Sequence, residues 1–231
     1  MDNTKKKNIL IVHNYYQIPG GEDTVVANEK KMLEKHGHKV ILYSRNNAEL
    51  KQMSKIQKAF LPITTVFNPR TYRDIKRLIG EEKIEVVHVH NTLNLVSPAV
   101  YYAARRMKVP VVQTIHNFRL LCPGATFYRD GHICEDCVEY GLKCAVKHSC
   151  YRGSKIQTLA CVLSTAFHRM TGIYGKINYI CLTDFNKQKL LGLKQIKRER
   201  VFVKPNFVEC KNDYVPEKDR KDQFVFAGRL D

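Results

Sequence analysis

Three histidine–asparagine pairs are the clearest candidates for chemistry in this sequence. Each pair follows a short apolar run: His13-Asn14, His90-Asn91 and His116-Asn117. A neutral imidazole can accept a proton, and an asparagine amide can hold a sugar hydroxyl. If the apolar runs are parallel strands, their carboxyl ends meet at one edge of a sheet. We therefore expect the three pairs to face a single crevice.

His88 lies close to the second pair, in Val87-His88-Val89-His90. We expect it to point to the other face of the strand from His90, or to be a hydrogen-bonded core residue. For any one of these histidines a structural role is as common as a functional one. Their recurrence at strand ends moves the balance toward function.

A glycine pair follows the first apolar run, in Pro19-Gly20-Gly21-Glu22. Two glycines let the backbone approach a bound group closely, and a helix N-terminus presents free N–H groups and a positive dipole end. This suits a phosphate at Gly20 and Gly21, although a plain glycine turn is equally compatible. The dinucleotide fingerprint G-x-G-x-x-G is absent.

Five of the eight cysteines fall between residues 117 and 153, which lack a clear periodicity. Cys134 and Cys137 have the C-x₂-C spacing of a zinc site, and a second pair would complete a tetrahedron. We predict Cys122, Cys134, Cys137 and Cys150 as ligands of a structural zinc. Cys144 competes for a place, His132 and His148 are outside candidates, and a set of reduced cysteines is the alternative.

The chain is strongly basic, with 39 Lys and Arg against 22 Asp and Glu and a net charge of +17. Such a field favours anionic partners, namely phosphates, nucleic acid or an acidic membrane surface. One basic segment, from Lys187 to Lys204, has no interleaved aromatic run for base stacking. We expect this segment to be a basic face exposed to solvent. The alternative is a patch that contacts a membrane surface.

The elements that must position these residues alternate regularly. We expect strands over 8–13, 39–44, 84–89, 109–115, 178–182 and 201–204, and helices over 22–36, 69–80, 98–107, 154–173 and 183–193. For residues 45–67 we expect a weak helix and an irregular stretch. This pattern is typical of a Rossmann-like α/β fold, an open parallel sheet with helices on both faces and a Cys-rich insertion at 117–153.

The same pattern divides the chain. Residues 1–208 form the expected domain, and the polar residues 209–223 form a linker. Residues 224–231 have a buried-strand pattern that predicts the start of a second α/β domain. No secretory signal or membrane-length apolar run is visible, so we expect a cytoplasmic protein with reduced cysteines.

Several segments resemble the N-terminal domain of family 4 glycosyltransferases, which have the GT-B fold. They are Gly20-Gly21-Glu22, 86–91 and His116-Asn117-Phe118-Arg119. Residues 122–154 resemble a cysteine-bearing bacterial subgroup. Residues 204–208 resemble the interdomain passage of the family, and 226–230 resemble the opening of its C-terminal domain.

The resemblance implies a retaining transfer of a sugar from a nucleotide-diphosphate donor, without a catalytic metal, to a glycan or lipid-linked acceptor. It makes His116 the catalytic residue near the transferred sugar, and it places Gly20, Gly21 and Arg229 at the donor diphosphate. His13, Asn14, His90, Asn91 and Asn117 are then expected on the acceptor side. Relatives commonly build surface polysaccharides at the cytoplasmic face of the membrane, so peripheral contact with anionic lipid is expected. On this resemblance we expect the chain to lack most of the donor domain, either as a fragment of a longer product or as a truncated chain.

Two other hypotheses compete with the transferase. The charge and the cysteines suit a zinc-bearing nucleic-acid-binding protein, although the even α/β alternation speaks against it, and we expect no nucleic-acid partner. The third hypothesis is a non-catalytic acceptor-binding module. Sugar-nucleotide binding separates the first from the third, and nucleic-acid titration tests the second.

Overall fold

The computed structural model describes residues 5–209 and 214–226, and its centre is a parallel β-sheet. The strand order is β2-β1-β3-β4-β7-β8, and every neighbouring pair is parallel. The bounds are β1 Asn8–Tyr15, β2 Lys39–Asn46, β3 Val86–Val89, β4 Val111–Ile115, β7 Asn178–Cys181 and β8 Val201–Val203. The predicted Rossmann-like fold class is confirmed.

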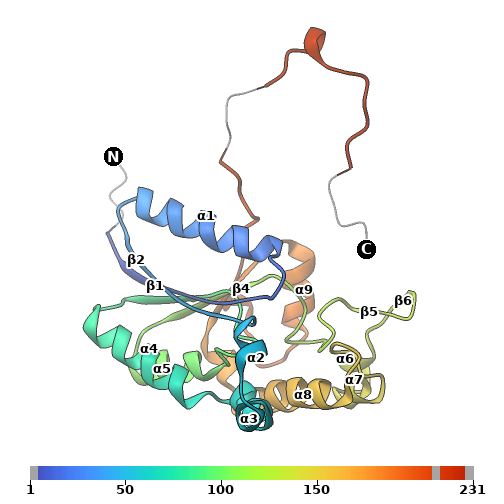
Figure 1. Ribbon diagram of the computed structural model, residues 1–231. Coiled ribbons are helices and arrows are strands. Elements are labelled where there is room, and N and C mark those ends of the chain that lie inside the picture. Colours follow the sequence, from blue (N-terminus) through green and yellow to red (C-terminus); the bar gives the residue numbers. More distant parts are fainter. Residues whose placement is uncertain (1–4, 210–213, 227–231) are drawn as a thin grey trace.

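Helices cover both faces of the sheet (Figure 1). Helix α1 (Gly21–Lys35) lies on one face, and α4 (Pro69–Glu81) and α5 (Ala99–Arg106) pack together on the other. Helices α8 (Lys155–Met170) and α9 (Asp184–Leu191) follow later in the chain. These helices begin and end within a few residues of the predicted positions.

The first strand shows how both faces are filled. Ile9 and Ile11 pack with Val26 of α1, whereas Leu10 and Val12 belong to the larger core on the α4–α5 side. Successive side chains of a strand point to opposite faces, so a strand buried on both sides must be apolar throughout. This explains the continuous apolar run before His13.

The stretch that the sequence leaves unclear forms two helices, α2 (Glu49–Gln52) and α3 (Lys55–Val66). Ser54 caps α3, because its hydroxyl accepts the Gln57 N–H at 3.2 Å. Pro62 stands inside the helix and removes one backbone donor, which weakens the local helical signal. Helix α3 packs against α8, and both lie along the lower side of the molecule in Figure 1.

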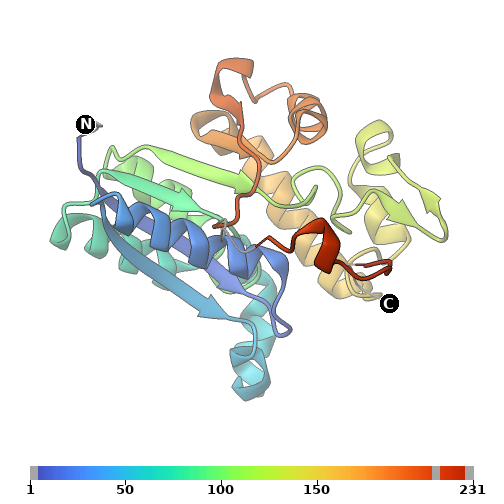
Figure 2. The same ribbon diagram turned by 90° about the horizontal axis from the view of Figure 1, so that it is seen from above.

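The cysteine-bearing insertion contains only short elements. They are β5 (Tyr128–Arg129), β6 (His132–Ile133), α6 (Asp136–Glu139) and α7 (Lys143–Lys147). The insertion packs on α8 through a small cluster of Cys137, Ala145 and Val162. Figure 2 shows it projecting at one side of the molecule next to α8.

After β8 the chain passes α1, where Lys204 pairs with Glu29, and Glu209 pairs with Lys31. Residues 214–226 contain one short 3₁₀ turn, Glu217–Asp219. Within this described segment, residues 224–226 are exposed and form no strand. The rest of the predicted second-domain start, with Arg229, lies outside the described residues. None of the helices in the described part of the chain is long and apolar enough to span a bilayer.

Candidate functional site

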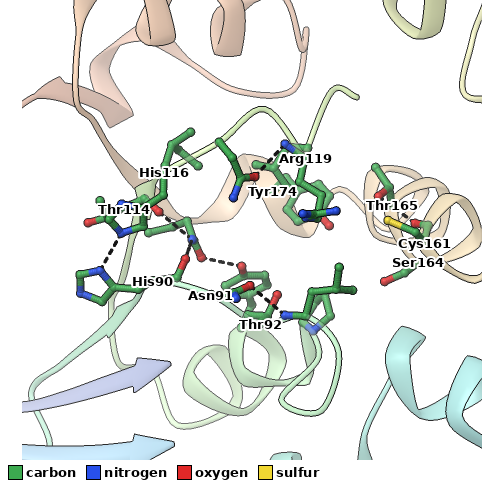
Figure 3. Close-up of a pocket in the computed structure, with 17 residues that line it drawn as sticks. His90, Asn91, Thr92, Thr114, His116, Arg119, Cys161, Ser164, Thr165 and Tyr174 are labelled. Carbon is green, nitrogen blue, oxygen red and sulfur yellow. Dashed lines mark hydrogen bonds between the residues drawn. The ribbon is translucent and has the colours of Figure 1, made fainter. Parts of the chain in front are cut away.

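His90 and His116 meet at the carboxyl ends of β3 and β4. Their rings are stacked with centroids 5.3 Å apart, and His90 Nδ1 lies 3.0 Å from His116 Nε2. Both residues, with Asn91 and Asn117, line a cavity of about 70 Å³ (Figure 3). Four members of the predicted site therefore share one pocket at the edge where ligands bind in open α/β sheets.

A buried carboxylate on α1, that of Glu29, contacts His90 of this pair. Glu29 Oε2 lies 3.3 Å from His90 Nε2, off the line of an ideal hydrogen bond, and Oε1 lies 2.5 Å from Lys204 Nζ. Burial raises the pKa of Glu29, but His90, His88 and Lys204 outweigh it and lower that pKa to about 2. Glu29 is therefore an anion at neutral pH.

The anion determines the direction of the hydrogen bonds. An ionised carboxylate only accepts, so His90 carries its proton on Nε2 and offers Nδ1 as an acceptor. His116 then donates from Nε2 and keeps an unprotonated Nδ1. Burial, with the neighbouring His90, lowers the pKa of His116 to about 4, so the ring is neutral at pH 7. These tautomers are assigned from the hydrogen-bond network.

The prediction that His88 points away from His90 is wrong. The two rings lie side by side with centroids 4.4 Å apart, and His88 Nδ1 is 3.6 Å from Glu29. The reason is the period of a strand, which places residues two apart on the same face. The alternative, a hydrogen-bonded core residue, describes His88 well, because it bonds Thr114 Oγ1 at 2.8 Å and burial lowers its pKa to about 3.

His13 connects the glycine loop to the histidines. Its Nε2 lies 2.7 Å from Asp23 Oδ1, while Asp23 Oδ2 accepts the Gly20 N–H at 2.9 Å. The His13 ring stands edge-on to His90 with centroids 6.2 Å apart, and it is fully buried. His13 thus fixes the start of α1 and does not line the cavity.

Gly20 and Gly21 sit at the N-terminus of α1, and the protein itself does not require glycine at either place. A Cβ built on either residue meets nothing within 4 Å, and neither residue has a positive φ. Neither glycine lines the cavity. Gly20 is connected to the histidines beside it by hydrogen bonds through Asp23 to His13. The space into which a side chain would project is empty at both glycines.

Asn14 has a structural position. Its Oδ1 accepts the N–H groups of Leu95 and Val96 at 2.8 and 3.3 Å, and its amide donates to Asn47 at 3.0 Å. The side chain is fully buried and is not among the residues of the cavity. It orders the loop that follows Asn91.

The sequence reasoning gave no role to Glu22 and quoted Arg119 only within a motif. Burial, with Asp23, raises the pKa of Glu22 to about 7, while nearby Arg119 opposes the shift, and Glu22 Oε1 is buried without a partner. Arg119 lines the cavity and donates to the Pro123 carbonyl at 2.9 Å. A carboxyl next to a glycine pair is a signal that the sequence does offer.

Two groups among the described residues have ligand atoms all within 4.8 Å of one another: Glu29, His88 and His90, and His13, Glu22 and Asp23. Lys204 already occupies the free side of Glu29, and its positive charge disfavours a cation there. The four predicted cysteines line one cavity of about 100 Å³, and Cys144 does not. Their sulfurs are not gathered to the 4.8 Å spacing of the other two groups.

Fold and site together define an open α/β domain with a polar pocket at the carboxyl edge of its sheet. The pocket offers a neutral histidine, asparagine amides and a buried arginine, groups that suit a hydroxyl-rich, anionic ligand. The model of Glycosyltransferase Family 4 matches residues 19–133, about half of the chain. The chain belongs to this family, and the resemblance noted from its motifs is confirmed.

One curated relative and two solved structures resemble parts of the chain. An uncharacterized 42.6 kDa protein in the cps region of Klebsiella pneumoniae is 27% identical over 120 residues, which is 48% of this chain and 32% of that protein. UDP-GlcNAc 2-epimerase from Methanocaldococcus jannaschii superposes with a TM-score of 0.46 at 16% identity, over 84% of this chain and 45% of the epimerase. The S. aureus MnaA-UDP co-structure superposes with a TM-score of 0.35 at 11% identity, over 87% of this chain and 69% of the MnaA chain.

Proposed function

We propose that this chain is the acceptor-side domain of a glycosyltransferase that transfers a sugar from a nucleotide-diphosphate donor during surface polysaccharide synthesis. Membership of glycosyltransferase family 4 and a relative in a cps region support the proposal. The match covers about a third of that relative, so the activity of a complete transferase is part of the proposal. The proposal keeps the retaining outcome and the absence of a catalytic metal that the family resemblance implies.

The observation that carries the proposal is the meeting of His90-Asn91 and His116-Asn117 in one cavity. The two pairs are 26 residues apart in the chain, and the parallel register of β3 and β4 brings them together. A pocket with several hydrogen-bonding groups at the carboxyl edge of the sheet is where a sugar would bind.

In the transfer, the bond between the anomeric carbon and the diphosphate breaks, the acceptor oxygen forms the new bond, and its proton passes to the departing diphosphate. We assign His116 Nδ1 to a hydroxyl of the transferred sugar, because this nitrogen is left unprotonated by the network. Glu29 and His90 are positioning residues that hold this tautomer, as a buried carboxylate does for a catalytic histidine elsewhere. The open backbone of Gly20 and Gly21 is the proposed contact of the donor diphosphate, where a helix N-terminus favours negative charge.

The test uses the longest protein that contains this chain. It is incubated with a panel of nucleotide sugars and with acceptors that carry either a free glycan or a lipid phosphate, and nucleoside diphosphate release is measured. We expect release with one donor, and a product whose anomeric configuration, read by NMR, equals that of the donor. An inverted product would overturn the retaining assignment alone.

The same experiment separates the alternatives. Nucleotide-sugar binding without turnover would leave a non-catalytic module, whereas no binding across the panel would contradict the proposal. A nucleic-acid titration at low salt covers the remaining alternative, and we expect no specific affinity there.

A further inference from the structure

Helices α3 and α8 each expose an apolar stripe that no described part of the chain covers. The side chains recur at helical spacing and are exposed: Ile56, Phe60 and Ile63 on α3, and Ile156, Leu159, Leu163, Phe167 and Met170 on α8. The opposite side of α8 is buried, with Thr158, Val162 and His168 facing the protein. Both helices are thus apolar on sides that the fold does not use, which marks an interaction surface.

A groove of about 430 Å³ lies between these helices. Its wall is largely apolar, formed by Leu50, Leu61, Pro62, Ile156 and Ala160 among others. Three cationic residues, Lys51, Lys58 and Arg152, complete the lining, and no acidic residue belongs to it. All three are exposed, and none of them forms an ion pair with a described residue.

The groove adjoins the cavity of His90 and His116. Cys161 lines both spaces, and it packs with Leu93 and Tyr151 in a small buried cluster between them. A single layer of side chains therefore separates the apolar groove from the proposed sugar site.

We propose that this groove binds a lipid phosphate, the chemical class of the acceptor, at the surface of an anionic membrane. The apolar wall takes the hydrocarbon chain, Lys51, Lys58 and Arg152 take the phosphate, and the stripes of α3 and α8 enter the interface. The net charge of +17 matches a negatively charged lipid surface. This inference rests on the proposed function, because it names the acceptor that the function leaves open.

The test is flotation of the chain with three kinds of vesicle: phosphatidylcholine alone, with phosphatidylglycerol, and with a long-chain polyisoprenyl phosphate at equal charge. We expect tightest binding to the polyisoprenyl phosphate and at least a tenfold loss in the double variant Lys51→Gln/Lys58→Gln. The matched control is Lys31→Gln/Lys35→Gln, which removes the same charge from α1 on the far face. Inorganic phosphate should not displace the chain.

A second readout uses the absence of tryptophan from the sequence. Phe60 on α3 and Phe202 on β8 are both 57% exposed. With polyisoprenyl phosphate vesicles, the emission of Phe60→Trp should shift to the blue and that of Phe202→Trp should not. Equal binding to phosphatidylglycerol, equal loss in the control variant, or no flotation would each overturn the proposal. None of these results depends on turnover, so a failed transferase assay remains distinguishable.

The cysteine cavity carries a second, independent inference. Cys122, Cys134, Cys137 and Cys150 come from three separate parts of the insertion and line one cavity of about 100 Å³. None of them forms a disulfide. A Cβ placed on Gly124 would lie 3.6 Å from Cys122 Sγ and 3.6 Å from the Cβ of Cys150, in ordinary van der Waals contact, so Gly124 lies against both cysteines.

We infer that these four cysteines bind one structural zinc ion, with Cys144 outside the ligand set. The insertion has only two-residue strands and helices of four and five residues, so a cross-link at its centre would order it. Binding has to draw the four sulfurs closer together than they stand in this structure.

Elemental analysis of the chain, purified under reducing conditions without chelator, tests this inference. We expect about one zinc per chain, lost in Cys134→Ser/Cys137→Ser and kept in Cys144→Ser. Cobalt in place of zinc should give the visible absorption of a tetrahedral thiolate site. Absence of stoichiometric metal from the wild-type chain, or equal loss in Cys144→Ser, would contradict the assignment.

Discussion

At the scale of single residues, the site depends on a chain of polar contacts that runs from Lys204 through Glu29 and His90 to His116. Each step is a contact of 3.3 Å or less. These contacts join the segment after β8 to the residue proposed to touch the sugar. The orientation of His116 therefore depends on a lysine nearly ninety positions away in the chain.

The glycine loop gives a prediction that separates function from stability. Gly21→Ala places a Cβ where nothing lies within 4 Å, in the first turn of α1, where alanine favours the helix. Thermal stability should be unchanged or slightly higher, while the affinity of the full-length protein for its nucleotide sugar falls at least tenfold. Gly80→Ala in α4, which is equally unhindered, is the control: its thermal stability should also be unchanged or slightly higher, but the affinity for the nucleotide sugar should not change.

Glu22 predicts a pH effect, because its pKa is raised from 4.5 to about 7 in the folded chain. The folded state prefers the protonated form, so this contribution is complete below about pH 4.5 and is lost as the pH rises through 7. Glu22→Gln should therefore stabilise the chain at pH 8 by about 2 kcal/mol and have little effect at pH 4.5. Urea unfolding at both pH values measures this change in the free energy of unfolding. The control is Glu81→Gln, at an exposed position. An equal effect at both pH values would argue against a buried carboxyl.

At the scale of elements, helix starts were predictable because the capping residues are local. The Asn68-Pro69 pair predicts the start of α4, and the Asn68 side chain accepts the N–H groups of Arg70 and Thr71 at 3.0 and 3.3 Å. The parallel sheet and the meeting of His90 with His116 could be predicted from the positions of the strand ends. The roles of Glu29 and Lys204 could not be predicted, because they depend on how α1 and the chain after β8 pack over the sheet.

Asn68 also ties α4 to the loop beside the site, since its amide donates to the Leu95 carbonyl at 2.7 Å. Asn68→Ala should cost about 2 kcal/mol of unfolding free energy, through the cap and the lost loop contact. Ser54→Ala, which removes the one bond that the Ser54 hydroxyl makes to the start of α3, should cost about 1 kcal/mol or less. Urea denaturation of both variants gives the comparison, and an equal cost would mean that the loop contact contributes nothing.

At the scale of the whole molecule, several histidines are buried in neutral form. Burial lowers the pKa of His13, of His88 to about 3 and of His116 to about 4. A depressed pKa adds stability above the unfolded value of 6.5, and that stability is lost as the pH falls toward the folded value.

The free energy of unfolding should therefore fall steadily between pH 6.5 and about 4. Each buried histidine adds up to about 1.4 kcal/mol per pH unit to this slope. Urea titrations at several pH values measure the slope, and exposed His36→Gln should leave it unchanged. A flat profile in this range would contradict the burial of the histidine cluster.

We propose that His116, in the pocket it shares with His90, acts on the transferred sugar. The most direct measurement is kcat/KM for sugar transfer by the full-length protein with His116→Ala, set against His36→Gln. We expect a loss of at least a hundredfold for His116→Ala, in a protein whose circular dichroism shows that it is folded, and no loss for His36→Gln. Wild-type kcat/KM in a folded His116→Ala protein would contradict it.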